Sequence, residues 1–252
     1  MHANRVGVFR PPWQFLNLDW RLGLILVLLW GLPRIIVVLS ANKTGNYQYV
    51  SLIFVTMIVL PFLLLNQSGR HKIGISRPRW KWLVSALFIG ISFSVLMFLL
   101  ADVLYGYTVH NWYVYISRSF SNIPSGLSSG DRSTYFVIYA IISMTFSPIG
   151  EELFYRGLVH ECFANSWGER AAQLSDSLAF SLPHLAHFGI VFVGGSWQFW
   201  PGAAALWVIL LFLLSLLFSF FRSKSQSVFG SIVAHAGFNL SMTYIIFYYI
   251  LP

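Results

Sequence analysis

The chain is poor in charged residues and nearly free of cysteine. Of its 252 residues 10% are charged and only eight are acidic. A soluble globular domain carries roughly 25% charged residues, so this chain has too few to cover a water-exposed surface. A single cysteine, Cys162, excludes an internal disulfide and a metal site built from several cysteines.

Hydrophobic and aromatic residues are abundant instead, which indicates a lipid bilayer as the solvent. The chain is 57% hydrophobic and has ten Trp and twelve Tyr, the residue types that gather at membrane interfaces. A net charge of +8 is also typical of nucleic-acid-binding proteins, but in a membrane protein Lys and Arg mark the cytoplasmic loops. We therefore expect an integral membrane protein with no nucleic-acid partner.

About seven apolar stretches approach the length that crosses a bilayer. A spanning helix needs about 20 apolar residues. The candidates are residues 22–40, 49–65, 82–105, 134–160, 175–195, 202–221 and 227–251. The sequence thus predicts an all-α, polytopic transmembrane helical bundle of about seven spans (six to eight), with residues 1–252 forming one integral-membrane domain.

Basic residues predict how this bundle is oriented. The segment 70–81 carries five Lys and Arg and no acidic residue, so we expect it in the cytoplasm. Counting spans from there places the N-terminus, the surroundings of Arg170 and the link 222–224 on the same side. The uncharged segment 190–201 falls outside.

Several polar residues lie within the expected spans. An ionisable side chain at membrane depth costs at least a few kcal/mol (about 2.5–3.5 on insertion scales), so such residues are usually paired, in contact with water, or functional. They are Glu151, Glu152 and Arg156 in the fourth span, His184 and His187 in the fifth, and His235 and Asn239 in the seventh.

The spacing of these residues predicts that they converge. Glu152 and Arg156 stand four positions apart and can pair on one helix face, while Glu151 is turned by about 100°. His235 and Asn239 are also four positions apart. From the helix rise, the groups of all three spans fall in the cytoplasmic half of the membrane. We expect one water-accessible cavity, open toward the cytoplasm or the lipid.

Each residue also has a structural interpretation. A Glu–Arg pair can be a clasp between helices, and Asn239 alone can be an interhelical hydrogen bond. Asp176 is expected at the cytoplasmic interface. His160 and Glu161 are expected beyond the membrane, and they do not complete the zinc signature H-E-x-x-H because Ala164 occupies its final position.

Together, three motifs are more specific than any one of these residues. The motif E-E-x-x-x-R matches Glu151 to Arg156, F-x-x-x-H matches Phe180 to His184, and H-x-x-x-N matches His235 to Asn239. In order and spacing they resemble the type II CAAX prenyl endopeptidase family, part of the CPBP or Abi group of intramembrane proteases. On this resemblance the motif-bearing core is about residues 134–251.

The resemblance implies an intramembrane endopeptidase that cleaves near the C-terminus of a membrane-associated substrate. Eukaryotic members of the family remove the last three residues of prenylated CAAX proteins. The small size of this chain is similar to that of bacterial and archaeal members, which predicts the plasma (inner) membrane of a prokaryote. Bacteria generally lack protein prenylation, so the expected partners are membrane lipid and either a peptide or a lipid-modified protein.

Peptide hydrolysis needs an activated water, a proton carrier and hydrogen-bond donors for the oxyanion. We assign Glu151 as general base, with His184 helping to hold the water. Arg156 keeps Glu152 ionised and fixed, and His235 and Asn239 face the oxyanion. The predicted catalytic residues are Glu151, Glu152, Arg156, His184, His235 and Asn239.

The sequence leaves both the use of a metal and the catalytic function open. No cofactor is favoured, but Glu151, His184 and His235 are the set that would hold zinc with an open position for water. Asn239 is a poor zinc ligand and a good oxyanion donor, which favours the metal-free mechanism. A non-catalytic membrane immunity or peptide-binding protein is also compatible with the sequence, as is a transporter with an intramembrane charge relay.

Overall fold

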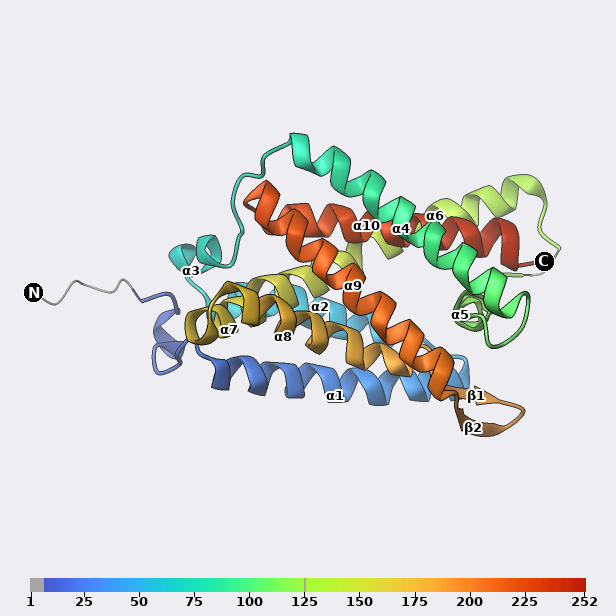
Figure 1. Cartoon of the computed structure of the whole chain (residues 1–252), viewed down its shortest axis with the longest axis horizontal. Helices are drawn as coiled ribbons and strands as arrows, with labels where there is room; N and C mark the ends of the chain where they lie inside the picture. The colour runs from blue at the N-terminus through green and yellow to red at the C-terminus, as the bar shows by residue number, and fades with distance from the viewer. Residues whose placement is uncertain (1–6, 125) are drawn as a thin grey trace, which may run out of the picture.

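A computed structural model of the chain describes residues 7–124 and 126–252 and confirms a helical membrane bundle (Figure 1). The long helices are α1 (Trp20–Thr44), α2 (Val50–Leu64), α4 (Lys81–Tyr105), α6 (Ser129–Glu151), α9 (Pro201–Ser225) and α10 (Val228–Ile245). The shorter α-helices are α3 (Gln67–Lys72), α5 (Trp112–Ile116), α7 (His160–Trp167) and α8 (Glu169–Ser181). Within the described residues, the only sheet is the antiparallel hairpin β1 (Ile190–Val193) and β2 (Ser196–Phe199).

In the residues that the structure describes, two segments are π-helical and three are 3-10 helical. The π-helices, Glu152–Val159 and Ile246–Ile250, continue α6 and α10 without a break. The 3-10 helices are Pro11–Trp13, Ser117–Phe120 and Leu182–Ala186. Because the first π-helix also joins α6 to α7, one helical stretch runs from Ser129 to Trp167.

Four helical stretches of the described chain are long and apolar enough to cross a membrane. They are α1, α4, the stretch Ser129–Trp167 and α9, and α2 is a shorter apolar helix. The helical membrane class predicted from the sequence is therefore confirmed. The number of spans, about seven, stays a prediction.

The fifth expected span, 175–195, is wrong as a continuous helix. Helix α8 ends at Ser181 and is followed by the 3-10 helix, which contains Pro183, and by the hairpin. Proline lacks an N–H donor and disfavours a continuing α-helix. Gly194 and Gly195 both have positive φ, as a two-residue hairpin turn requires. An apolar run with a proline and a diglycine thus forms a helix end and a hairpin.

Glycines let two helices pack backbone to backbone. A Cβ on Gly90 of α4 would lie 2.0 Å from the carbonyl oxygen of Ala234, and one on Gly237 of α10 would lie 2.4 Å from that of Leu87. Small residues permit such approach between membrane helices. The α4 contact thereby fixes the part of α10 that carries His235.

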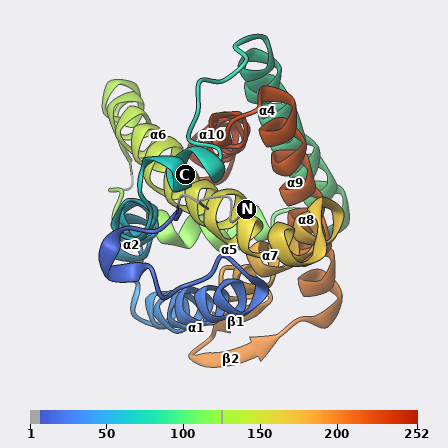
Figure 2. The ribbon, with the colours of Figure 1, turned by 90° about the vertical axis from the view of Figure 1, so that its left-hand side faces the viewer.

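The two ends of the bundle differ in charge. Helix α3, the basic segment before α4, α7 and the C-terminal end of α9 lie at one end, while α5, the hairpin and the C-terminus lie at the other (Figure 1). Figure 2 views the molecule from the first of these ends. This arrangement agrees with the grouping of loops by charge. The side predicted for the N-terminal residues 1–6 falls outside the described chain.

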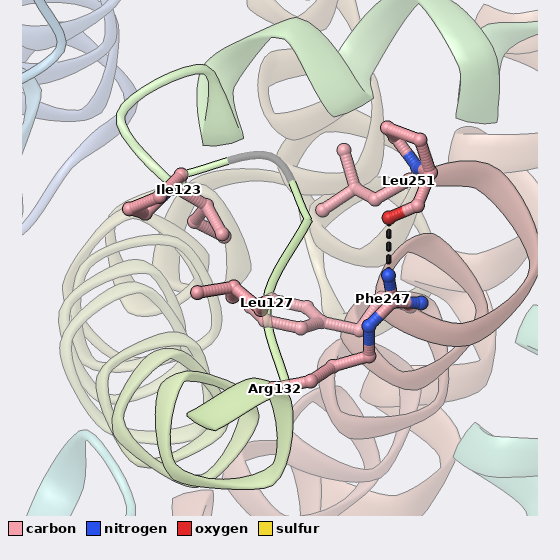
Figure 3. Close-up of a pocket in the computed structure, with 7 residues that line it drawn as sticks. Ile123, Leu127, Arg132, Phe247 and Leu251 are labelled. Atoms are coloured by element: carbon pink, nitrogen blue, oxygen red, sulfur yellow. Dashed lines mark hydrogen bonds between the residues drawn. The ribbon is translucent and has the colours of Figure 1, made fainter. Parts of the chain in front are cut away.

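A small pocket of about 60 Å³ lies at the C-terminal end (Figure 3). Arg132, near the start of α6, donates hydrogen bonds to the carbonyl oxygens of Phe247, at 3.4 Å, and of Pro252. These bonds tie α6 to the end of the chain. The predicted site residues lie elsewhere in the described chain and do not line this pocket.

Candidate active site

Glu151, the last residue of α6, lies at the centre of the predicted site. Its side chain is 1% exposed. Oε1 forms an ion pair with Nη1 of Arg34 from α1, and Oε2 accepts a hydrogen bond of 2.8 Å from the Ser147 hydroxyl. His184 Nε2 is 4.0 Å from Oε1, and His235 Nε2 is 3.7 Å from Oε2. This carboxylate is therefore reached from four helical elements.

Glu152 forms a second buried layer behind Glu151. Its Oε1 accepts a hydrogen bond of 3.2 Å from Arg156 Nη1 and one of 2.9 Å from His235 Nδ1. Both Glu152 and Arg156 are fully buried. The predicted pairing of Glu152 with Arg156 thus exists, and it also orients His235.

Arg156 is held by its surroundings as well as by its charge. Nη2 donates a hydrogen bond of 2.5 Å to the Ser215 hydroxyl of α9. The guanidinium lies over the Phe180 ring at 4.3 Å and over the Phe218 ring at 5.3 Å. A guanidinium can stack on aromatic rings and has a planar set of N–H donors, whereas the ammonium group of lysine has neither property.

The motif lies at a junction between helix types. The α-helix ends at Glu151, and the π-helix begins at Glu152 and contains Arg156. Single π-helical turns within α-helices occur frequently at functional sites. Here the wider turn still leaves Glu152 and Arg156 in contact.

His184 lies in the 3-10 helix after α8 and has a defined tautomer. Its Nδ1 donates a hydrogen bond of 2.7 Å to the carbonyl oxygen of Phe180. Because a carbonyl can only accept, Nδ1 carries a proton and Nε2 of the neutral ring is an acceptor. Arg34 Nη2 donates to this Nε2 at 3.0 Å and approaches His187 Nε2 at 3.5 Å.

Asn239 lies one turn beyond His235 on α10. Its Nδ2 donates a hydrogen bond of 2.8 Å to the carbonyl oxygen of Ser143 on α6. An amide nitrogen has two donors, so one N–H remains for another acceptor.

The site surrounds a cavity of about 140 Å³. Its polar lining includes Arg34, Glu151, His184, His235 and Asn239. Glu152 and Arg156 lie behind this lining. The structure therefore brings all six predicted residues together, four at the cavity wall and two in support.

A second cavity of about 320 Å³ adjoins the first. Both are lined by Phe54, Ile116, Ser147, His187, Asn239 and Met242. The larger cavity runs between α2 and α6 toward α5 and the loop before α2. Ser51, Ile142 and Phe146 at its rim are exposed. The opening expected from the sequence, toward the cytoplasm or the lipid, stays a prediction.

The described residues that line the larger cavity include no Asp, Glu, Lys or Arg. Its polar lining consists of hydroxyl, amide and imidazole groups. Burial raises the pKa of Tyr47, at the end near the loop, to about 12, so its hydroxyl is neutral at physiological pH. This hydroxyl donates a hydrogen bond of 2.8 Å to Asn42 Oδ1.

Three residues outside the site, His160, Glu161 and Asp176, are buried within the protein, which the sequence did not predict. Their expected positions relative to the membrane stay predictions. His160 Nδ1 is 2.6 Å from Asp176 Oδ2, and Arg222 Nη2 donates to Glu161 Oε1 at 3.1 Å. These pairs join α7 to α8 and α9, which explains the burial of their charges.

Sequence reasoning missed Arg34. It stands in the first apolar span, and its side chain is 2% exposed. The rule that directed attention to Glu151 applies to it equally, since an ionisable residue inside a span needs a partner. Arg34 was not predicted because it belongs to no motif and lies 117 positions from Glu151. At that separation, residue spacing does not indicate a contact.

The fold and the site define a helical membrane protein with a buried cavity of Glu, His and Asn. Residues 133–241 match the family model described as type II CAAX prenyl endopeptidase Rce1-like. This match confirms the resemblance drawn from the three motifs, all of which lie in the matched segment. The searches of curated proteins and of solved structures found no match. Arg34 lies outside the matched segment.

Proposed function

We propose that this protein is an intramembrane endopeptidase of the CAAX-processing type that hydrolyses a peptide bond near the C-terminus of a membrane-associated substrate. The observation that carries the proposal is the shared cavity, in which Glu151 lies with His184, His235 and Asn239 from separate elements. The family match supports protease activity.

Glu151 is the general base of the proposed reaction. A water beside its carboxylate gives up a proton to Glu151 while the water oxygen attacks the peptide carbonyl carbon. The hydrogen bond from Ser147 fixes the carboxylate, and the surrounding helices limit bulk water. A positioned base of this kind contributes about 10²–10⁴-fold to a rate.

His235 is suited to move a proton. Glu152 accepts from its Nδ1 and leaves Nε2 toward Glu151 and the cavity. A buried carboxylate in this relation holds one tautomer and stabilises the imidazolium form. The proton that Glu151 takes from the water passes to His235 Nε2, which lies 3.7 Å from Glu151 Oε2, and the resulting imidazolium gives it to the departing amine when the C–N bond breaks.

Asn239 supplies a donor for the oxyanion. Its remaining N–H is available at the cavity wall while its hydrogen bond to Ser143 fixes the amide. Removing one such donor typically costs about 10²–10³-fold in kcat. Imidazolium His235 is the second donor.

The larger cavity is the proposed binding groove for the substrate. Its neutral lining favours an uncharged peptide segment, because a charged side chain there would lose water without gaining a partner. Its exposed rim between α2 and α6 admits a substrate that is already anchored in lipid. The proposed enzyme acts in the plasma membrane of a prokaryote.

A peptide panel tests the function. Purified protein in lipid nanodiscs is given a farnesylated CAAX peptide, the same peptide without lipid, and a version with Lys in the last three residues. We expect cleavage of at least one uncharged peptide by the wild type and a loss of about 100-fold or more in Glu151→Ala, His184→Ala and His235→Ala. Folded variants that all cleave normally contradict the site, and tight binding by a wild type that does not cleave favours a peptide-binding protein.

A further inference from the structure

Arg34 occupies a position that the proposed reaction leaves unexplained. Its guanidinium lies between Glu151 Oε1, with which Nη1 pairs, and His184 Nε2, to which Nη2 donates at 3.0 Å. Arginine stays protonated in proteins, so a permanent positive charge stands at the cavity wall. Among the described residues, it is the only Lys or Arg that lines this cavity.

The same donor atoms are those that a zinc ion would need. Zinc bound by Glu151, His184 and His235 would take oxygen and nitrogen donors at about 2.0–2.2 Å. Two of these three side chains already face the guanidinium, and a metal ion between them would lie against a fixed like charge. In the part of the chain that the structure describes, no group of three or more His, Cys, Asp or Glu side chains is arranged to hold a metal. The residues present therefore do not fit zinc.

We propose that Arg34 is a positioning residue that takes the place of a metal ion in this site. One guanidinium holds Glu151 in place through an ion pair and keeps His184 in a single tautomer through a charge-assisted hydrogen bond. Its charge excludes divalent cations from the cavity. This proposal rests on the proposed function for the reaction it serves, but its main test reads metal binding and not cleavage.

Cobalt titration of purified protein, followed by the visible absorption of bound Co²⁺, tests the proposal. Wild type should show no stoichiometric cobalt binding. Arg34→Ala should bind one Co²⁺ with an affinity at least about tenfold higher than any weak binding by the wild type. The double variant Arg34→Ala, His184→Ala should lose this cobalt binding. Arg222→Ala, which removes an arginine from the partly buried ion pair with Glu161, should behave as wild type. A folded Arg34→Ala protein without cobalt binding, or wild type with one zinc that requires Glu151 and His184, overturns the proposal.

Two measurements keep the proposal testable where Arg34→Ala fails to fold. Wild type should keep its full cleavage rate after chelation with EDTA, and chelator-sensitive cleavage that zinc restores would contradict the proposal. In the milder Arg34→Gln variant, cleavage should fall at least about tenfold and recover in part with added guanidinium ions. A variant that cleaves at the wild-type rate, or one that guanidinium does not restore, rejects the positioning role. A wild type that cleaves no peptide refutes the proposed function, but the cobalt titration still tests whether Arg34 excludes a metal ion.

Discussion

At the residue scale, the site depends on buried charges that are paired on several sides. Glu152 accepts from both Arg156 and His235, and Arg156 also contacts Ser215 and stacks on Phe180. An uncompensated charge in this environment is costly, so each partner is needed for the others to remain charged.

Arg156→Ala tests this dependence. It leaves the Glu152 carboxylate buried with one partner fewer, and breaking a buried pair in this way costs about 3–5 kcal/mol. Unfolding in mixed micelles should show that loss, whereas Lys72→Ala, at an exposed position, should change stability by about 0.5 kcal/mol or less. An Arg156→Ala protein as stable as the wild type would contradict the ion network.

At the scale of helices, close packing sets where the catalytic groups lie. The α4–α10 contact has no room for a Cβ at Gly90, because the carbonyl oxygen of Ala234 would be 2.0 Å away. Ala234 precedes His235, so a displaced α10 moves the imidazole away from Glu151 and Glu152.

Gly90→Ala should therefore reduce both stability and activity. Overpacking of this kind costs about 1–3 kcal/mol, which exceeds the gain of about 1 kcal/mol from replacing a helical glycine. The matched control is Gly202→Ala in α9, where a Cβ meets nothing within 4 Å. Thermal unfolding and cleavage rate measure both, and equal behaviour of the two variants would refute the packing argument.

The gap between α2 and α6 is the second consequence of helix packing. The helices meet where a Cβ on Gly150 would lie 2.7 Å from the carbonyl oxygen of Phe54, and the larger cavity lies between them on the side of Ser51 and Phe146. This geometry predicts lateral entry of the substrate.

Ser51→Trp should obstruct that entry. We expect KM to rise at least about tenfold with a smaller change in kcat, because the substitution removes binding and not chemistry. Ser196→Trp in the exposed hairpin is the control. An unchanged KM for Ser51→Trp would place the substrate path elsewhere.

At the scale of the whole molecule, charge asymmetry predicts orientation. The end with α3 and the basic segment 70–81 should face the cytoplasm, and the hairpin end should face outward.

Cysteine labelling in intact cells checks the orientation. Cys162 is fully buried and gives little background. His71→Cys at an exposed site of α3 should react with a membrane-impermeant maleimide only after permeabilisation, whereas Ser196→Cys should react at once. The reverse pattern would invert the predicted topology.

The fold class and the six site residues could be predicted from the sequence because composition and short motifs are enough to recognise them. Composition reveals the bilayer, and spacing of four positions reveals pairs such as Glu152–Arg156. Sequence reasoning failed where structure depends on distant contacts. Arg34 is recognised only through Glu151, and the burial of His160 only through Asp176. The hairpin at Gly194 was missed since overall apolarity concealed the turn signal.

The most direct test of the account is the mass of the products formed in ¹⁸O-labelled water from the best-cleaved peptide of the panel. The wild type should place one ¹⁸O atom in the new carboxyl group of the cleaved peptide, and Glu151→Gln should form at least about 100-fold less of this product. Equal amounts of labelled product from a folded Glu151→Gln protein would contradict the account.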